Sequence, residues 1–124
     1  MVKRKRRPSR QTALQRALRE MIQEGQFRAA VVASIDGLPL ATVGRSADKE
    51  LMAGVAAWLK EYAERTHVSL DEIVARDPQG NCFVSRYFNV GDDPLLLAVK
   101  VPPGQPHRRL TNKAIREIKR VWES

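Results

Sequence analysis

Two apolar runs joined by Asp36-Gly37 constrain the fold of this chain more than any other feature. Residues 29–35 are almost entirely apolar and rich in β-branched side chains, which is typical of a strand covered on both faces in the middle of a sheet. Asp-Gly between two such runs is the strongest short-range signal for a two-residue type I′ hairpin. Pro39 lies in the returning run, residues 38–43, and cannot donate a ladder hydrogen bond. The sequence therefore predicts a hairpin with one central strand and one edge strand.

Three amphipathic helices and three further strands account for most of the remaining chain. The first helix has Ser9 or Thr12 as its cap, and Gly25 lies just past its predicted end. The second helix, residues 49–65, follows a cap at Ser46 or Asp48. Short links between the strands favour antiparallel pairing. The other predicted elements are strands over residues 70–77, 82–90 and 95–101 and a closing helix that begins near residue 108.

The second helix has an apolar face wider than one sheet face requires. Its apolar arc spans roughly 160°, whereas about 100° is enough to cover a sheet, and the small residues Ala53, Gly54 and Ala57 lie beside the arc. We interpret this as two burial partners, the chain's own sheet and a second subunit; the alternative is a helix deeply buried in its own fold. Trp58 and Leu59 lie on different sides of the arc, and Trp58 is the predicted partner-facing side. The arc consists of Leu51, Met52, Val55, Ala56, Trp58, Leu59, Tyr62 and Ala63.

The net charge of +8 comes mainly from the start of the chain. The first ten residues hold six of the 22 basic residues and no acidic residue, so the rest of the chain carries only +2. We predict a disordered arm over residues 1–9 and a single domain over residues 10–124. The arm is either a solvated tail or a docking segment for nucleic acid, an anionic membrane or an acidic protein. Its candidate anion-binding residues are Lys3, Arg4, Lys5, Arg6 and Arg7.

The sequence contains no recognisable constellation for catalysis or for cofactor binding. His67 and His107 have no Cys, His or carboxylate at metal-ligand spacing. Cys82 is the single cysteine, which excludes an intramolecular disulfide and fits a reducing compartment. No phosphate-binding glycine loop is present. We therefore predict that the chain is not an enzyme, that it uses no metal, cofactor or small-molecule substrate, and that it is cytoplasmic.

Two motifs and the order of the elements resemble the roadblock/dynein light chain family. The motifs are A-S-I-D-G-L-P-L-A, residues 33–41, and the small-residue helix L-M-A-G-V-A-A, residues 51–57. The resemblance covers roughly residues 10–122, although the basic tail and the Pro-rich loop at 102–106 lie outside the common pattern. It implies an α+β fold: a five-stranded antiparallel sheet with the middle helix on one face and the two terminal helices on the other.

The resemblance also implies a function. Family members pair as homodimers or heterodimers through the middle helix and the next strand, here residues 49–65 and 70–77, and bacterial and archaeal members often regulate small Ras-like GTPases. We therefore predict a homodimeric adaptor that binds such a GTPase; no arginine finger is assigned, and Arg45 and Arg65 are only candidates. The alternative is a protein that binds nucleic acid or an anionic membrane through the arm and the basic last helix. The predicted interface residues are Leu51, Met52, Gly54, Val55, Trp58, Leu59, Tyr62, Ile73 and Val74.

Overall fold

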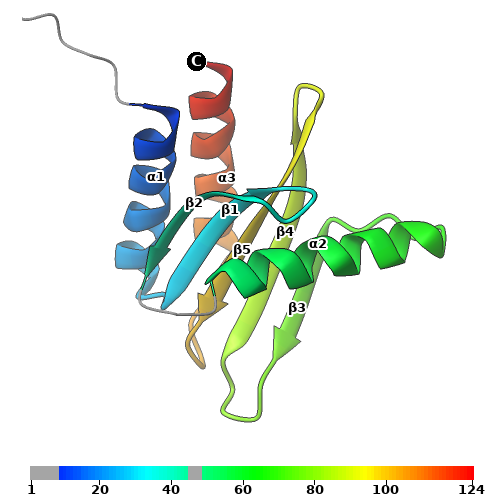
Figure 1. Cartoon of the computed structure of the whole chain (residues 1–124). Helices are drawn as coiled ribbons and strands as arrows, with labels where there is room; N and C mark the ends of the chain where they lie inside the picture. The colour runs from blue at the N-terminus through cyan, green and yellow to red at the C-terminus, as the bar shows by residue number, and fades with distance from the viewer. Residues whose placement is uncertain (1–8, 45–48) are drawn as a thin grey trace, which may run out of the picture.

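The computed structural model describes residues 9–44 and 49–124 as a helix-covered antiparallel sheet. The sheet has five strands in the order β2-β1-β5-β4-β3. Figure 1 shows α2 crossing one face and α1 and α3 lying side by side on the other, as predicted. The elements are α1 (Arg10–Gly25), β1 (Ala29–Ser34), β2 (Pro39–Gly44), α2 (Lys49–Arg65), β3 (Glu72–Arg76), β4 (Cys82–Val90), β5 (Asp93–Val101) and α3 (Arg108–Glu123).

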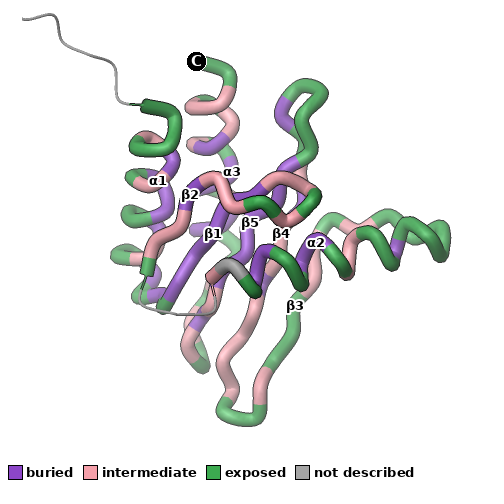
Figure 2. The backbone as a smooth tube through the Cα atoms, in the orientation of Figure 1, coloured by how far each residue is buried: buried purple, intermediate pink, exposed green. Residues whose placement is uncertain are grey.

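The strand order confirms the predicted roles of the apolar runs. β1 lies between β2 and β5, and β5 lies between β1 and β4. Residues 29–33 of β1 are all buried, as Figure 2 shows along the purple strand. β2 pairs with β1 alone and is therefore an edge strand. This is the position in a sheet that tolerates a proline such as Pro39, which cannot donate a ladder hydrogen bond.

The hairpin between β1 and β2 differs from the predicted two-residue turn. The Ser34 amide donates to the Leu38 carbonyl at 3.0 Å, and the Gly37 amide donates to the Ser34 carbonyl at 2.9 Å. These bonds enclose a three-residue loop in which Gly37 alone has a positive φ, +89°. A type I′ turn needs positive φ at both of its central residues, so that prediction was wrong for Asp36. The chain instead turns through a three-residue loop that ends at Gly37, and the pairing of β1 with β2 shifts its register between Val32 and Ala33.

The structure shows which residue caps α1, and it corrects the predicted end of the arm and the predicted end of the helix. Ser9 is the N-cap, because its hydroxyl accepts a hydrogen bond from the Thr12 amide at 3.1 Å. Ser9 thus belongs to the helix start and not to the arm, whose residues 1–8 lie outside the described residues. At the other end Gln26, not Gly25, takes the left-handed cap conformation. Gly25 is instead the last helical residue, where a Cβ would lie 2.5 Å from the Phe27 ring.

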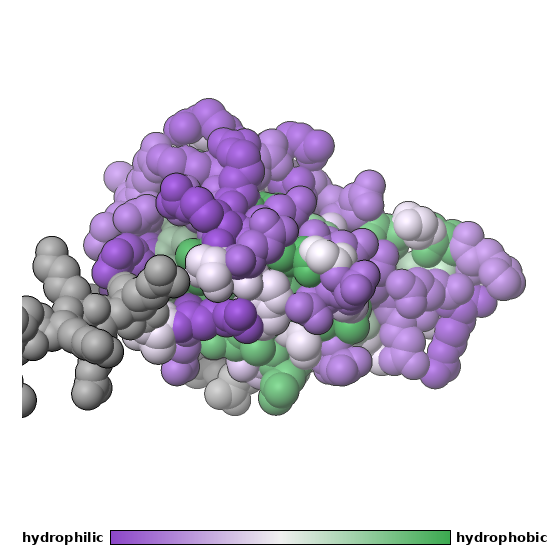
Figure 3. Space-filling view, turned by 90° about the horizontal axis from the view of Figure 1, so that it is seen from above, coloured by the Kyte–Doolittle hydropathy of each residue, from purple (hydrophilic) through white to green (hydrophobic). Residues whose placement is uncertain are grey.

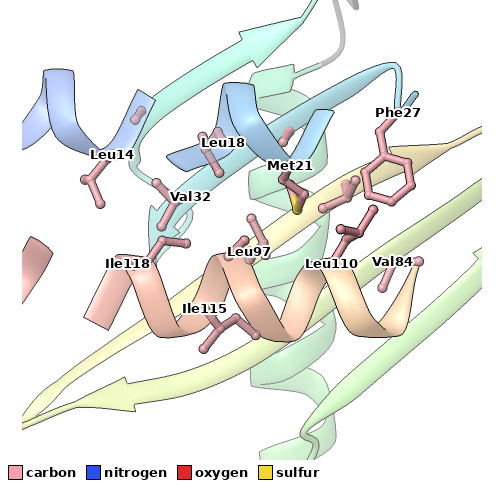
Figure 4. Close-up of a cluster of buried hydrophobic side chains, with 14 of the residues drawn as sticks. Leu14, Leu18, Met21, Phe27, Val32, Val84, Leu97, Leu110, Ile115 and Ile118 are labelled. Atoms are coloured by element: carbon pink, nitrogen blue, oxygen red, sulfur yellow. The ribbon is translucent and has the colours of Figure 1, made fainter. Parts of the chain in front are cut away.

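Two apolar clusters lie on opposite faces of the sheet. The larger joins α1 and α3 to the sheet, and Figure 4 shows Leu18, Leu97 and Ile118 among the side chains that meet there. The smaller lies under α2 and contains Val31, Leu96 and several alanines. Successive side chains of β1 and β5 point in turn into one cluster and then the other. Each of these strands is therefore apolar along nearly its whole length.

Candidate functional site

α2 packs on only part of the sheet. It contacts β1, β5 and β2, and its C-terminal half projects beyond the sheet, where Figure 2 shows it largely exposed. Two hydrogen bonds fix its position: the Tyr87 hydroxyl donates to the Ala56 carbonyl at 2.7 Å, and the Lys60 ammonium donates to the Leu70 carbonyl at 2.7 Å. The tip of the hairpin also lies against α2, since a Cβ on Gly37 would be 3.2 Å from Ala57. The helix is therefore held firmly while one side of it stays open.

The open side of α2 carries four large apolar side chains, which we call the apolar ridge: Leu51, Val55, Trp58 and Tyr62. Their spacings of four, three and four residues place them in one row on the helix surface. Each residue is between 46% and 65% exposed, and the Trp58 and Tyr62 rings are stacked with centroids 5.8 Å apart. In Figure 3, seen from above, hydrophilic residues dominate the described surface and hydrophobic residues gather in patches. A continuous row of exposed apolar side chains is typical of a surface that another protein covers.

An apolar groove of about 330 Å³ runs beside this ridge, between α2 and strands β3 and β4. Leu51, Val55 and Leu59 form its helix side, and Ile73 and Phe83 lie on its strand side. The groove is open because α2 packs mainly on β1 and β5. Ridge and groove together form one surface with room for apolar side chains of a partner.

The structure places all but one of the predicted interface residues on this surface. The four ridge residues and Gly54 are exposed, and a Cβ on Gly54 would meet no atom within 4 Å. Leu59 and Ile73 are half-buried and line the groove. Met52 packs in the cluster under α2 and also lines the groove. Val74 is the correction: it alternates with Ile73 and so points to the α3 face, with Glu72, which pairs with Arg108 of α3.

Other sequence interpretations concerning α2 are also resolved. The small residues Ala53 and Ala57 are buried in the chain's own fold, so only Gly54 leaves space for a second backbone. Trp58 faces outward as predicted, whereas Leu59 lies at the groove and not in the core. Arg65 is exposed and pairs with Glu61 at 2.7 Å. Arg45, Ser46 and Asp48 lie outside the described residues.

Sequence reasoning missed the two residues that anchor α2. The side chain of Tyr87 is buried, and its hydroxyl donates a hydrogen bond to the backbone of α2. Lys60 belongs to the polar side of the helix wheel, but its ammonium lies 5.4 Å from the centre of the Tyr87 ring and caps the Leu70 carbonyl. Both contacts join segments distant in sequence, and a helical pattern carries no signal for them.

We expect a Tyr87→Phe variant to lose about 1 kcal/mol of unfolding free energy at neutral pH, the typical contribution of one hydrogen bond. Burial raises the pKa of Tyr87 from 10.0 to about 12. Between these pH values the unfolded chain gives up its phenolic proton while the folded chain retains it, so stability is lost as the pH rises. Urea unfolding at neutral pH and between pH 10 and 12 should therefore show the difference between wild type and Tyr87→Phe shrinking. Tyr62→Phe, which changes an exposed phenol, is the matched control, and a difference that stays constant would contradict the expectation.

Within residues 9–44 and 49–124, no three His, Cys, Asp or Glu side chains gather closely enough to hold a metal ion. In that part of the chain, too, each helix is too short or too polar to cross a membrane.

Solved structures share this architecture at low sequence identity. The chain is similar to the gliding protein MglB from Thermus thermophilus, with a TM-score of 0.74 and 15% identity over 95% of this chain and 94% of that one. It is also similar to Myxococcus xanthus MglB, with a TM-score of 0.76 and 12% identity over 97% and 95% of the two chains. A Roadblock/LC7 domain from Streptomyces avermitilis gives a TM-score of 0.68 and 19% identity over 88% and 94%. No family model matches the chain, and no curated protein matches its sequence. The chain therefore has the roadblock/LC7 fold, which confirms, at the level of the fold, the family resemblance predicted from its sequence.

Proposed function

We propose that this chain is a non-enzymatic homodimeric adaptor that binds and regulates a small Ras-like GTPase. The apolar ridge of α2 carries the proposal, because four large apolar side chains in one row are each between 46% and 65% exposed. The resemblance to the roadblock family supplies the class of partner. MglB, which shares the fold at 15% identity, has been solved in a tetrameric arrangement, and this supports self-association here.

The spacing of the ridge suggests how two copies pair. An antiparallel arrangement about a two-fold axis places each residue opposite its complement in sequence, so that Leu51 meets Tyr62 and Val55 meets Trp58. Gly54 beside this row leaves room for the second helix to approach. The groove between α2 and β3 borders the same contact and can accept side chains of the second copy. Such a dimer covers the exposed apolar side chains of both copies at once.

Regulation in this proposal is a matter of positioning. A rigid pair of α2 helices forms a platform that binds one conformation of the GTPase switch loops better than the other, and this difference in affinity shifts their equilibrium. Tyr87, Lys60 and the hairpin tip keep each helix fixed on its sheet. The adaptor needs no catalytic residue of its own for this mechanism.

Three measurements test the proposal. Light scattering at micromolar concentration should give twice the chain mass of 14.0 kDa, and a value equal to one chain would contradict the dimer. The immobilised chain should then retain a guanine-nucleotide-binding protein from extracts of its source organism, identified by mass spectrometry. Release of a fluorescent guanine nucleotide from that protein should change when the adaptor is added. If wild type retains no such protein beyond what a monomeric variant retains, the GTPase proposal fails.

A further inference from the structure

We propose that the α1–α3 face of the molecule binds the surface of an anionic phospholipid bilayer. This face lies across the sheet from the apolar ridge, so both surfaces can be occupied at the same time. The inference rests on charge and shape and does not require the GTPase proposal.

Charge divides unequally between the two sides of the molecule. α1 and α3 together hold nine basic and four acidic residues, a net charge of +5. Residues 26–107, which form the sheet and α2, hold eight basic and ten acidic residues, a net charge of −2. The excess positive charge of the domain is therefore confined to the two-helix layer.

Four cations form a row along the outer side of α3, which we call the basic stripe: Arg109, Lys113, Arg116 and Arg120. They repeat at intervals of four, three and four residues and lie opposite the buried Leu110, Ala114 and Ile118. All four are exposed, and the row extends about 16 Å along the helix. Glu24 and Glu117 pair with three of them, so the stripe still carries a charge of +2 when both carboxylates are counted. Lys113 and Arg109 hold the pKa of Glu24 below its usual range.

The start of α1 is joined to the end of α3 on this face. Arg10 lies over the Trp122 ring at 4.3 Å, and its guanidinium donates to the Trp122 carbonyl at 3.2 Å. The start of α1 is thereby fixed beside the end of α3, close in sequence to Arg120. Residues 1–8, which precede Ser9 in the sequence, carry five more basic residues and no acidic residue.

Shape favours a bilayer over nucleic acid. Two helices side by side, with axes about 8–10 Å apart, make a surface wider than the single helix that a DNA major groove admits. Base stacking would need exposed aromatic rings, whereas Trp122 is half-buried and its indole N–H donates to Asp93 at 2.8 Å. Among the described residues, the large exposed hydrophobics all lie outside α1 and α3. The expected binding is therefore electrostatic, reversible by salt, and without insertion into the hydrocarbon.

The test is sedimentation with vesicles of phosphatidylcholine, with and without phosphatidylserine. We expect wild type to bind only the phosphatidylserine vesicles at about 0.1 M salt and to be released at about 1 M, where charges are screened within about 3 Å. The triple variant Arg109→Gln, Arg116→Gln, Arg120→Gln should bind at least about tenfold more weakly, since each basic residue near an anionic surface contributes roughly fivefold. The control variant Arg65→Gln, Lys100→Gln removes charge from α2 and from the α2 side of the sheet, where Lys100 lies over the Phe83 ring, and it should bind within about twofold of wild type.

A second variant keeps the test independent of the stripe. Removing residues 1–8 takes away five basic residues while keeping the Ser9 cap, and it should also weaken vesicle binding. Circular dichroism confirms that each variant is folded. The proposal is overturned if the triple variant and the control bind equally well, or if binding to phosphatidylcholine alone matches wild-type binding. Tighter binding to duplex DNA than to phosphatidylserine vesicles, at equal phosphate concentration, would overturn it in favour of nucleic acid.

Discussion

A Trp58→Arg substitution is expected to convert the proposed dimer into a folded monomer that no longer binds the proposed GTPase partner. Trp58 is 61% exposed, and its main internal contact is the stacked ring of Tyr62, so the monomer loses little. In the proposed dimer the arginine faces the apolar Val55 of the second copy and is buried without a counter-ion. An unpaired buried charge costs several kcal/mol, which raises the dissociation constant at least about 100-fold. Analytical ultracentrifugation over a concentration series measures the change.

Two further variants make this result interpretable. Trp58→Phe keeps an apolar aromatic ring on the ridge and should remain dimeric. Ala53→Arg places the same charge at a fully buried position on the sheet side of α2 and should unfold the chain. Leu59 is less suitable as the sheet-side control, because it lines the groove and is only half-buried. A Trp58→Arg protein that stays dimeric would show that the ridge is not the interface, whatever the fate of the other variants.

The hairpin shows how far local sequence signals determine structure. The apolar runs and Pro39 correctly predicted a central strand beside an edge strand, because burial and hydrogen-bonding capacity are properties of the residues themselves. The turn type was wrong because Asp-Gly also suits a three-residue loop in which only Gly37 has positive φ. Choosing between them depends on how Gly37 fits against α2, a contact distant in sequence.

The sequence also predicted only part of the candidate site. Helical periodicity found the bounds of α2 and the outward side of Trp58, since both follow from a repeat of 3.6 residues. It could not separate the part of the arc that faces the sheet from the part that faces solvent. Met52 therefore proved to pack in the core as well as at the groove, and Val74 proved to face α3. The first outcome depends on where α2 rests on the sheet and the second on the pairing of β3 with β4, and tertiary contacts decide both.

The largest loss of stability from a single methyl group is expected at Gly44. This residue ends β2 with φ of +113°, a conformation that L side chains rarely adopt. A Cβ there would lie 2.5 Å from the Arg28 carbonyl oxygen and 2.6 Å from the Ala29 Cα. Neither atom can move away easily, because the Arg28 amide donates to the Lys100 carbonyl at 2.9 Å and Ala29 pairs with strands on both sides. Backbone strain together with this overlap should cost about 3 kcal/mol or more.

Gly91→Ala is the matched control for Gly44→Ala. Gly91 also has a positive φ, +61°, but a Cβ there would meet no atom within 4 Å. Its substitution carries only the cost of a left-handed alanine, about 1–2 kcal/mol. Thermal unfolding at one fixed protein concentration should therefore place the midpoint of Gly44→Ala well below that of Gly91→Ala; the concentration is held constant because pairing itself stabilises a dimer. Equal midpoints would mean that the backbone around Arg28 and Ala29 yields to the methyl group and that Gly44 is needed only for its φ.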